Sequence, residues 1–250
     1  MKKQNLENLR HSVSHLMTMA VLEKFPNAGL GVGPSIENGF YQDYDLGEDK
    51  ITEEDLPSLQ KKIKELIKQK LDFKQNNSNL AETLEFYKND PYKIEMAQDL
   101  IDKGEKTLSF YDTGDFHNLC KGPHIENTSE INPDAFKLTR IAGAYWKGDE
   151  NNKMLTRIYG VAFETKEELE KHLEMLEEAE KRNHRKIGKE MELFVNLPEV
   201  GQGLPIWLPK GYAMRRVLED YMLKMERSYG YEHMLSPHIN KAELFETSGH

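Results

Sequence analysis

Cysteine, long apolar runs and an excess of basic residues are what this sequence lacks. Its 250 residues contain one cysteine, Cys120, so no disulfide can form within the chain. No apolar run approaches the roughly 18 residues of a membrane-spanning helix. Residues 1–5 lead into a polar segment and not into the apolar core of a secretory signal. These absences predict a cytoplasmic protein that does not bind membranes.

The charge balance limits the classes of partner. There are 34 basic and 43 acidic residues, a net charge of −9 at pH 7. This balance argues against binding nucleic acid through a wholly basic surface. Lysines and arginines do gather locally at 61–70 and at 181–189, but such runs are usually solvated helix faces. The glycines of 29–33 do not have the spacing of a dinucleotide-binding motif.

Two short motifs carry possible chemistry. His11 and His15 lie four positions apart in a segment, 5–25, whose apolar spacing predicts a helix, so both imidazoles can point to one spot. Cys120 and His124 are also four positions apart, with a Gly-Pro turn between them. We predict that these four side chains converge on a common centre.

Three interpretations of the four residues stay open at this point. They can be ordinary buried or surface side chains. They can bind Zn²⁺, which prefers imidazole and thiolate donors, although four protein ligands would indicate a structural site. They can also form a metal-free polar pocket that positions water or a substrate hydroxyl. Spacing does not choose among them.

The remaining patterns predict an α+β protein. Residues 1–164 mix helices and antiparallel-looking strands without a regular βαβ alternation. The helices are expected at 5–25, from 52, at 79–88 and at 92–102, and the strands at 29–32, 39–45, 108–112, 135–140, 141–146 and 154–163.

A connector and an incomplete second domain are expected after residue 164. Thr165 and Glu168 form a capping box that begins a helix running to about 188. Its length and its charge on several faces suit a linker. Beyond it, we expect an extended segment at 203–209, a helix at 212–229, a strand at 231–236 and a helix from 241. Residues 189–250 leave no room to complete a sheet.

Six segments, in this order, resemble threonyl-tRNA synthetases, which are class II aminoacyl-tRNA synthetases. They are HSVSH at 11–15, GVGPSIENGFYQDYDL at 31–46, CKGPH at 120–124, AGAYWKGDENNKMLTRIYG at 142–160, HRKIGKEMELF at 184–194 and PKGYAMRRVLEDYM at 209–222. The resemblance implies an editing domain at 1–164, with a mixed or antiparallel sheet and helices. It also implies a linker helix at 165–188 and, at 189–250, the start of the aminoacylation domain, with the helix and strand of its first motif.

The implied activity is hydrolysis of serine wrongly attached to threonine tRNA, Ser-tRNA(Thr). Serine lacks one methyl of threonine, which is worth only about 1–3 kcal/mol in a binding pocket, so a second, hydrolytic pocket is needed. The implied partners are the acceptor end of tRNA(Thr), the esterified serine or threonine and, for the full-length enzyme, a second copy in a homodimer. Editing is expected to need no cofactor.

The aminoacylation reaction is implied only for the complete enzyme. ATP, Mg²⁺ and zinc belong to parts of the catalytic domain that this sequence does not contain. The chain is therefore expected to be a fragment or a truncated product that does not aminoacylate tRNA by itself.

The resemblance also implies roles for individual residues. His11, His15 and His124, together with Lys93, are expected to position water and the terminal ribose. Cys120 is expected to shape the pocket and not to act as a nucleophile.

Two substrate-binding positions depart from bacterial relatives. Asn118 stands where an acidic residue is expected, and Gln42 where an aromatic is expected, so editing rate or serine preference is expected to differ. The alternatives are a freestanding trans-editing deacylase, a catalytically inactive tRNA-binding or dimerisation remnant and an unrelated zinc protein.

Overall fold

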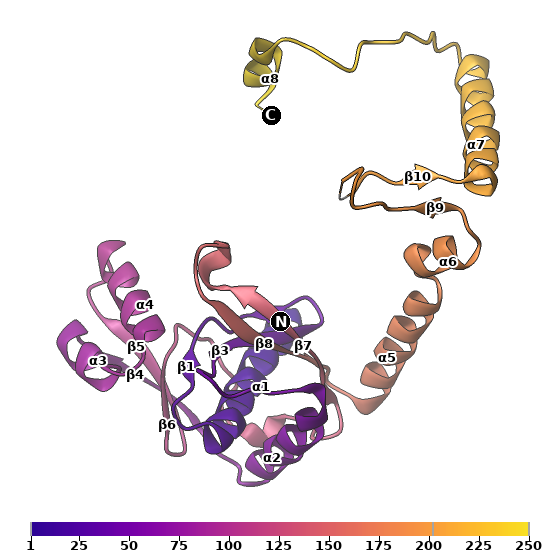
Figure 1. The fold of residues 1–250 in the computed structure, drawn as a ribbon. Helices are drawn as coiled ribbons and strands as arrows, with labels where there is room; N and C mark the ends of the chain where they lie inside the picture. Colours follow the sequence, from indigo (N-terminus) through magenta and orange to yellow (C-terminus); the bar gives the residue numbers. More distant parts are fainter. Residues whose placement is uncertain (1, 202, 250) are drawn as a thin grey trace. The chain divides into compact units, whose positions relative to one another are not determined.

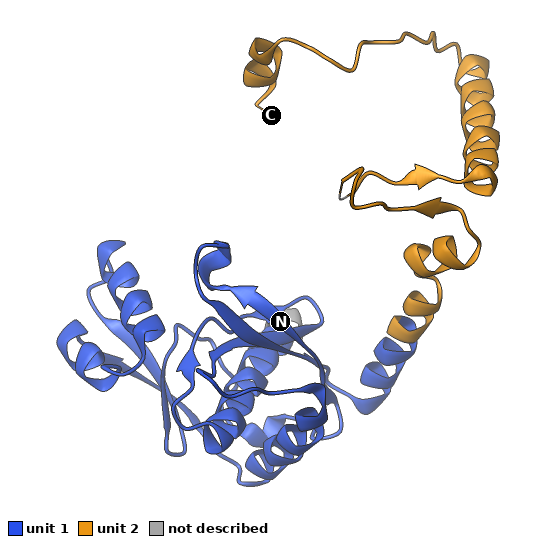
Figure 2. Cartoon of the chain, viewed as in Figure 1, with its two compact units in different colours: residues 1–175 blue, residues 176–250 orange. Residues whose placement is uncertain are grey.

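The computed structural model describes residues 2–201 and 203–249. They divide into two compact units, residues 1–175 and 176–250 (Figure 2). Helices and antiparallel sheets confirm the predicted α+β class. In the part of the chain so described, no helix is both long and apolar enough to cross a membrane.

The first unit is built on an antiparallel sheet covered by two helices (Figure 1). Its strands run in the order β1 (Gly29–Leu30), β3 (Gly39–Asp45), β8 (Met154–Ala162) and β7 (Phe136–Tyr145), and β2 (Ser35–Ile36) pairs with β3. Helices α1 (Lys2–Lys24) and α2 (Leu56–Lys68) pack on each other and on this sheet. One turn of 3-10 helix, Glu53–Asp55, precedes α2, where the sequence predicted the start of a helix.

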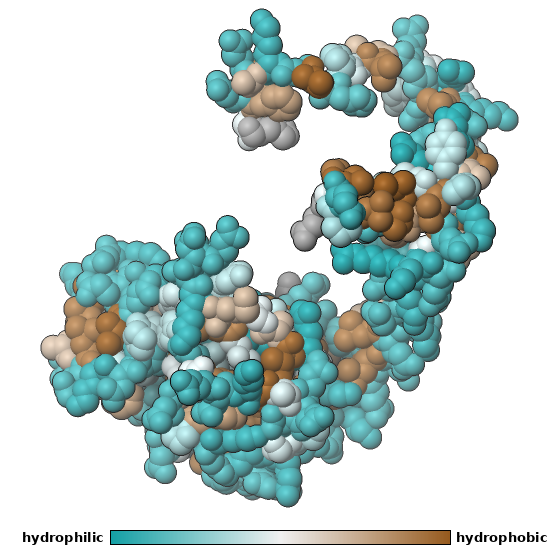
Figure 3. Space-filling view, viewed as in Figure 1, coloured by the Kyte–Doolittle hydropathy of each residue, from teal (hydrophilic) through white to brown (hydrophobic). Residues whose placement is uncertain are grey.

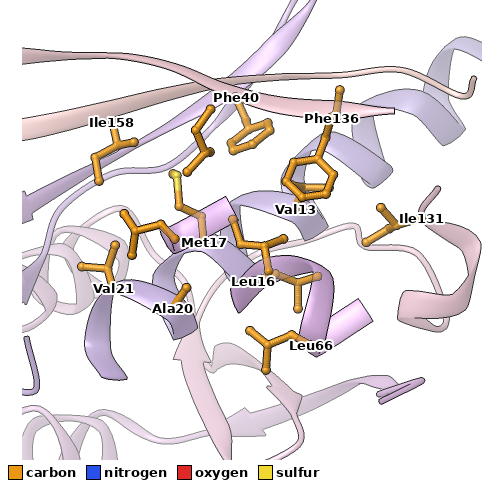
Figure 4. Packing of buried hydrophobic residues seen from close by; sticks show 14 of the residues in the cluster. Val13, Leu16, Met17, Ala20, Val21, Phe40, Leu66, Ile131, Phe136 and Ile158 are labelled. Atoms are coloured by element: carbon orange, nitrogen blue, oxygen red, sulfur yellow. The ribbon is translucent and has the colours of Figure 1, made fainter. Parts of the chain in front are cut away.

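The core lies between α1 and the sheet. Val13, Leu16 and Met17 recur on one face of α1 and are fully buried, because they meet Phe40 of β3 and Ile158 of β8 (Figure 4). Burial of each such side chain stabilises the fold by about 1.5–3 kcal/mol. This packing fixes the face of α1 that carries the predicted site.

A second, smaller sheet joins the first unit. Its order is β4 (Phe73–Ser78), β5 (Leu108–Thr113) and β6 (Phe116–Leu119), all antiparallel, with α3 (Leu80–Phe86) and α4 (Pro91–Asp102) following β4. Asn79 caps α3, and Asp90 caps α4 with a proline at its first position. The β5–β6 hairpin ends immediately before Cys120.

The strand predictions are partly wrong for this unit. The two expected strands at 135–140 and 141–146 are the single strand β7, because a bulge between Leu138 and Arg140 shifts the alternation of its side chains. Strands β4 and β6 were not predicted, since the polar sequence of β4 has no apolar alternation. Short 3-10 helices lie at Thr128–Glu130 and Trp146–Gly148.

The single linker helix predicted at 165–188 is also wrong. The structure has α5 (Lys166–Lys181) and a separate α6 (His184–Glu190). The Asn183 side chain accepts a hydrogen bond from the Arg185 N–H and so begins a new helix. The division between the two units falls within α5, and the three domain boundaries stay predictions.

The second unit is small and exposes apolar side chains. Strands β9 (Phe194–Val195) and β10 (Ile206–Trp207) form a hairpin, followed by α7 (Pro209–Ser228) and α8 (Ala242–Ser248). The strand predicted at 231–236 is wrong, because no described strand pairs with this segment. Figure 3 shows apolar residues on the surface around β9 and β10. The exposed large side chains of this hairpin include Leu204, Ile206 and Trp207.

Candidate functional site

Helix α1 supplies two imidazoles to one place. His15 is 2% exposed and His11 is half-buried, with ring centroids 5.3 Å apart. The ring of His124 lies 4.2 Å from each of them. Residues more than one hundred positions apart in the chain therefore form one cluster of rings.

The turn after β6 brings the thiol to this cluster. Cys120 Sγ lies 3.3 Å from Nε2 of His11 and 3.3 Å from Nε2 of His124, and it accepts the Gly122 N–H at 3.3 Å. The Gly122–Pro123 peptide is cis, and Gly122 has a φ of 66°. A Cβ at Gly122 would overlap the ring of Tyr111. The ligating atoms of the three histidines and Cys120 all lie within 4.8 Å of one another.

Hydrogen bonds fix which nitrogen of His124 carries the proton. Ser12 Oγ donates to the Asn8 carbonyl at 2.9 Å and accepts the Ile125 N–H at 3.2 Å. Its one proton is therefore used, so His124 Nδ1, at 3.1 Å, must donate to it. His124 Nε2 then presents a lone pair to the centre of the cluster.

Burial keeps the histidines neutral. It lowers the pKa of His124 to about 2 and the pKa of His15 well below its usual range. Burial also lowers the pKa of His11, against the raising effect of a hydrogen bond to the Pro123 backbone. Neutral imidazoles can accept a proton from water or bind a metal ion.

Cys120 is not activated as a nucleophile. Burial raises the pKa of its thiol, an effect that the Gly122 N–H and the charge of Lys93 only partly oppose. Because the thiolate is the reactive form, a buried neutral thiol at pH 7 is inert. The geometry thus agrees with a shaping role for this side chain.

Lys93 is a buried ammonium beside the cluster. It lies in the first turn of α4, is 4% exposed, and its Nζ donates to the Leu119 carbonyl at 3.4 Å. Burial lowers its pKa from 10.5 to about 8. The group is still mainly charged at pH 7, and it can give up its proton easily.

Asn118 orients His15. Its Nδ2 donates to His15 Nε2 at 3.3 Å, and its Oδ1 accepts the hydroxyl of Tyr87 at 3.4 Å. Tyr87 in turn accepts the Leu119 N–H at 2.8 Å. His15 Nδ1 is buried and has no hydrogen-bond partner among the described residues. Tyr87 belongs to none of the sequence motifs, so no sequence signal indicated its part in the site.

Gln42 supports the wall of a cavity. It is 5% exposed, and its Nε2 donates to the carbonyls of Gly31 at 2.9 Å and Asp43 at 3.2 Å. A Cβ at Gly33 would overlap the Gln42 amide, so this glycine is needed for close approach and not only for a turn. The cavity, of about 610 Å³, is lined by His11, His15, Gly31–Pro34, Tyr41, Gln42, Lys93, Met96 and 118–122.

A second cavity adjoins the first. It measures about 500 Å³ and lies along α4 and the start of β5. Both cavities have Met96 and 119–121 in their walls. The cluster therefore faces enough space for a ligand larger than an amino acid. His124 contacts the other rings of the cluster but is not in the wall of either cavity.

The cluster also has the composition of a zinc site. Three imidazoles and one thiolate are ligands that Zn²⁺ prefers, and His124 Nε2 is the unprotonated nitrogen of its ring, facing the Cys120 thiol at 3.3 Å. Four protein ligands would give a closed, structural site. Binding would require Cys120 to lose its proton, because the thiolate is the ligand.

Comparison with known proteins agrees with this geometry. Residues 108–159 match the family described as the threonyl and alanyl tRNA synthetase second additional domain. The match includes β5, β6 and the turn with Cys120 and His124, and so contains half of the four-residue cluster.

Nearly the whole chain is similar to threonine--tRNA ligases. It is 47% identical over 98% of its length to that of Geobacillus sp. (strain WCH70), 46% identical over 97% to that of Enterococcus faecalis, and 48% identical over 96% to that of Flavobacterium psychrophilum. The chain spans 38%, 37% and 36% of these relatives' own lengths. The resemblance predicted from the sequence is thereby confirmed.

Proposed function

We propose that this chain hydrolyses Ser-tRNA(Thr), as the editing part of a threonyl-tRNA synthetase. The observation that carries the proposal is the buried set of neutral imidazoles and one ammonium at a cavity, in a chain similar to threonine--tRNA ligases. Ester hydrolysis needs a positioned water, a proton acceptor and a donor to the developing oxyanion. Each has a candidate here.

The proposed reaction assigns one task to each group. The neutral imidazole of His11, which lines the cavity, accepts a proton as water attacks the ester carbonyl carbon. The Lys93 ammonium donates a hydrogen bond to the carbonyl oxygen, where negative charge develops. The bond from the carbonyl carbon to the ribose oxygen breaks, and that oxygen takes up a proton. The products are free serine and tRNA with its terminal hydroxyl restored.

Asn118 and Gln42 act by positioning. Asn118 holds the His15 ring by donating a hydrogen bond from its neutral amide, which is weaker than the charge-assisted bond that the carboxylate expected there would accept. Gln42 holds the loop at Gly31 that forms the opposite wall. In this proposal, the wall decides whether the extra methyl of threonine is excluded.

A zinc ion held by His11, His15, Cys120 and His124 is the alternative occupant of the cluster. When bound, such an ion would act as a Lewis acid or as a structural centre, and the closed ligand set favours the structural role. Metal analysis of the purified protein tests this alternative. One equivalent of zinc, lost in Cys120→Ala, would support it.

The testing experiment compares Ser-tRNA(Thr) with Thr-tRNA(Thr). The full chain should release serine much faster than threonine, and a His11→Ala, His15→Ala double variant should be inactive. His238→Ala, which changes an exposed histidine, is the matched control and should keep full activity. If both esters survive at the buffer rate, the catalytically inactive remnant becomes the better description.

The wider proposals follow from the similarity of the sequence. The complete enzyme would attach threonine to tRNA(Thr) with ATP, Mg²⁺ and zinc and would act as a homodimer in the cytoplasm. A trans-editing deacylase that works as a separate protein is the alternative. It predicts that removing residues 176–250 from the chain leaves serine release unchanged.

A further inference from the structure

Two tyrosines and two arginines lie together on one face of the first sheet. Tyr41 of β3 pairs with Tyr159 of β8, and Arg140 of β7 pairs with Tyr159 from the other side. Successive side chains of a strand point to opposite faces. Because Phe40 and Ile158 face the core, their neighbours Tyr41 and Tyr159 lie on the opposite face.

The four side chains contact one another and are held in place. The Arg157 guanidinium lies 3.9 Å from the centroid of the Tyr41 ring and binds both carboxylate oxygens of buried Asp43, at 2.6 and 2.8 Å. Arg140 lies 4.1 Å from the centroid of the Tyr159 ring. The two tyrosine rings are 5.7 Å apart. We call Tyr41, Arg140, Arg157 and Tyr159 the Tyr–Arg face.

The charges on this face differ from those of the protein as a whole. Asp43 neutralises Arg157, which therefore serves to position the rings. Arg140 is exposed, and no described acidic side chain forms an ion pair with it. A chain of net charge −9 thus presents here an unpaired cation whose planar group is backed by an aromatic ring.

The Tyr–Arg face is continuous with the candidate site. Tyr41 belongs to the face and also lines the 610 Å³ cavity with His11 and Lys93. Bases of single-stranded RNA stack on aromatic rings and on guanidinium planes, and arginine adds attraction for phosphate. A ligand whose end lies in the cavity and whose backbone is anionic would cross this face.

We propose that the Tyr–Arg face binds the unpaired nucleotides that precede the terminal adenosine, with one base stacked on Arg140. The proposal rests on the proposed function, since that function places the RNA terminus in the cavity. It adds the route by which the RNA reaches the cavity. It also names Arg140 as the side chain that contacts the RNA.

The first test uses RNA that carries no esterified amino acid, so that the result does not depend on hydrolysis. A fluorescent single-stranded oligoribonucleotide ending in CCA is titrated with the full chain, and binding is followed by anisotropy at several salt concentrations. Arg140→Ala should weaken binding roughly tenfold and lower the salt dependence by about one counterion. Arg140→Lys should restore the salt dependence but only part of the affinity, because lysine keeps the positive charge but lacks the planar guanidinium on which a base can stack.

The matched control is Tyr145→Ala on the same strand. Tyr145 is 41% exposed but has the opposite parity to Arg140, so it lies off the Tyr–Arg face. It should bind RNA like the unaltered chain. Equal affinities for Arg140→Ala and Tyr145→Ala would overturn the proposal, and a protein segment would then be the better candidate for this face.

The second test separates this proposal from the proposed function. Hydrolysis of Ser-tRNA(Thr) is compared with hydrolysis of 3′-seryl-adenosine, which has no preceding nucleotides. Arg140→Ala should raise KM for the tRNA roughly tenfold, leave kcat unchanged and leave seryl-adenosine unaffected. If the unaltered chain hydrolyses neither ester, the proposed function fails and anisotropy still decides on the face. If the unaltered chain hydrolyses both esters and Arg140→Ala does not change KM for the tRNA, the proposed binding of RNA to the Tyr–Arg face is refuted.

Discussion

Replacing Lys93 by methionine should stabilise the protein while it stops hydrolysis. The side chain is fully buried, and burial lowers its pKa from 10.5 to about 8. This lowering of the pKa, at about 1.4 kcal/mol per pH unit, means that the charged form of Lys93 lowers the free energy of unfolding by about 3 kcal/mol. Methionine is similar in length and carries no charge, so it removes this cost.

A lost hydrogen bond reduces the expected gain. Lys93 Nζ donates to the Leu119 carbonyl at 3.4 Å, a long bond whose loss should cost about 1 kcal/mol. The net gain in the free energy of unfolding at pH 7 is therefore about 2 kcal/mol. Serine release should fall by a factor of about 100 or more, because the donor to the oxyanion is gone.

The gain should depend on pH in a definite direction. The unfolded lysine keeps its ordinary pKa of 10.5, so between about pH 8 and 10.5 the unfolded chain binds a proton that the folded chain lacks. Stability of the unaltered protein therefore rises with pH across this window. The advantage of Lys93→Met is full below pH 8 and disappears near pH 10.5.

Urea unfolding of the full chain at pH 7 and at pH 10 measures this difference. Lys103→Met, at the exposed end of α4, is the control and should change stability by less than about 0.5 kcal/mol. The reasoning is refuted if Lys93→Met is less stable than the unaltered chain at pH 7, or if its advantage is the same at both pH values.

Three further substitutions test other parts of the site. Asn118→Asp places a carboxylate beside His15 Nε2, which raises the pKa of that imidazole and should speed serine release up to about tenfold in single-turnover assays; no increase would contradict the orienting role. Cys120→Ala should keep the rate within about threefold, and the unaltered thiol should resist iodoacetamide below pH 9, because burial keeps it protonated; a hundredfold loss would indicate direct participation. Arg157→Met leaves buried Asp43 without its partner and should lower the free energy of unfolding by about 3 kcal/mol, seen as a lower Tm, with partial recovery on adding Asp43→Asn.

Local patterns identified much of the fold. The spacing of Leu9, Val13 and Leu16 predicted α1, and the capping box of Thr165 and Glu168 predicted where α5 begins. Predictions from short-range sequence preferences failed where pairing with a distant strand determines whether a segment forms a strand. The polar strand β4 exists because β5 pairs with it, and residues 231–236 form no strand because none of the described strands pairs with them.

The sequence by itself determined which residues can form the cluster. Helical periodicity puts His11 and His15 on one face of α1, and a single cysteine near a histidine completes the donor set. The order of the motifs indicated the family. None of these inferences needs a contact between distant segments.

Only the tertiary structure decided what the cluster can do. The protonation of His124, Lys93 and Cys120 depends on burial by residues that are distant in the sequence, and the tautomer of His124 depends on Ser12. The Tyr–Arg face likewise exists only when β3, β8 and β7 pair in this register. Desolvation and strand register are properties of the assembled fold, so no pattern within one segment can give them.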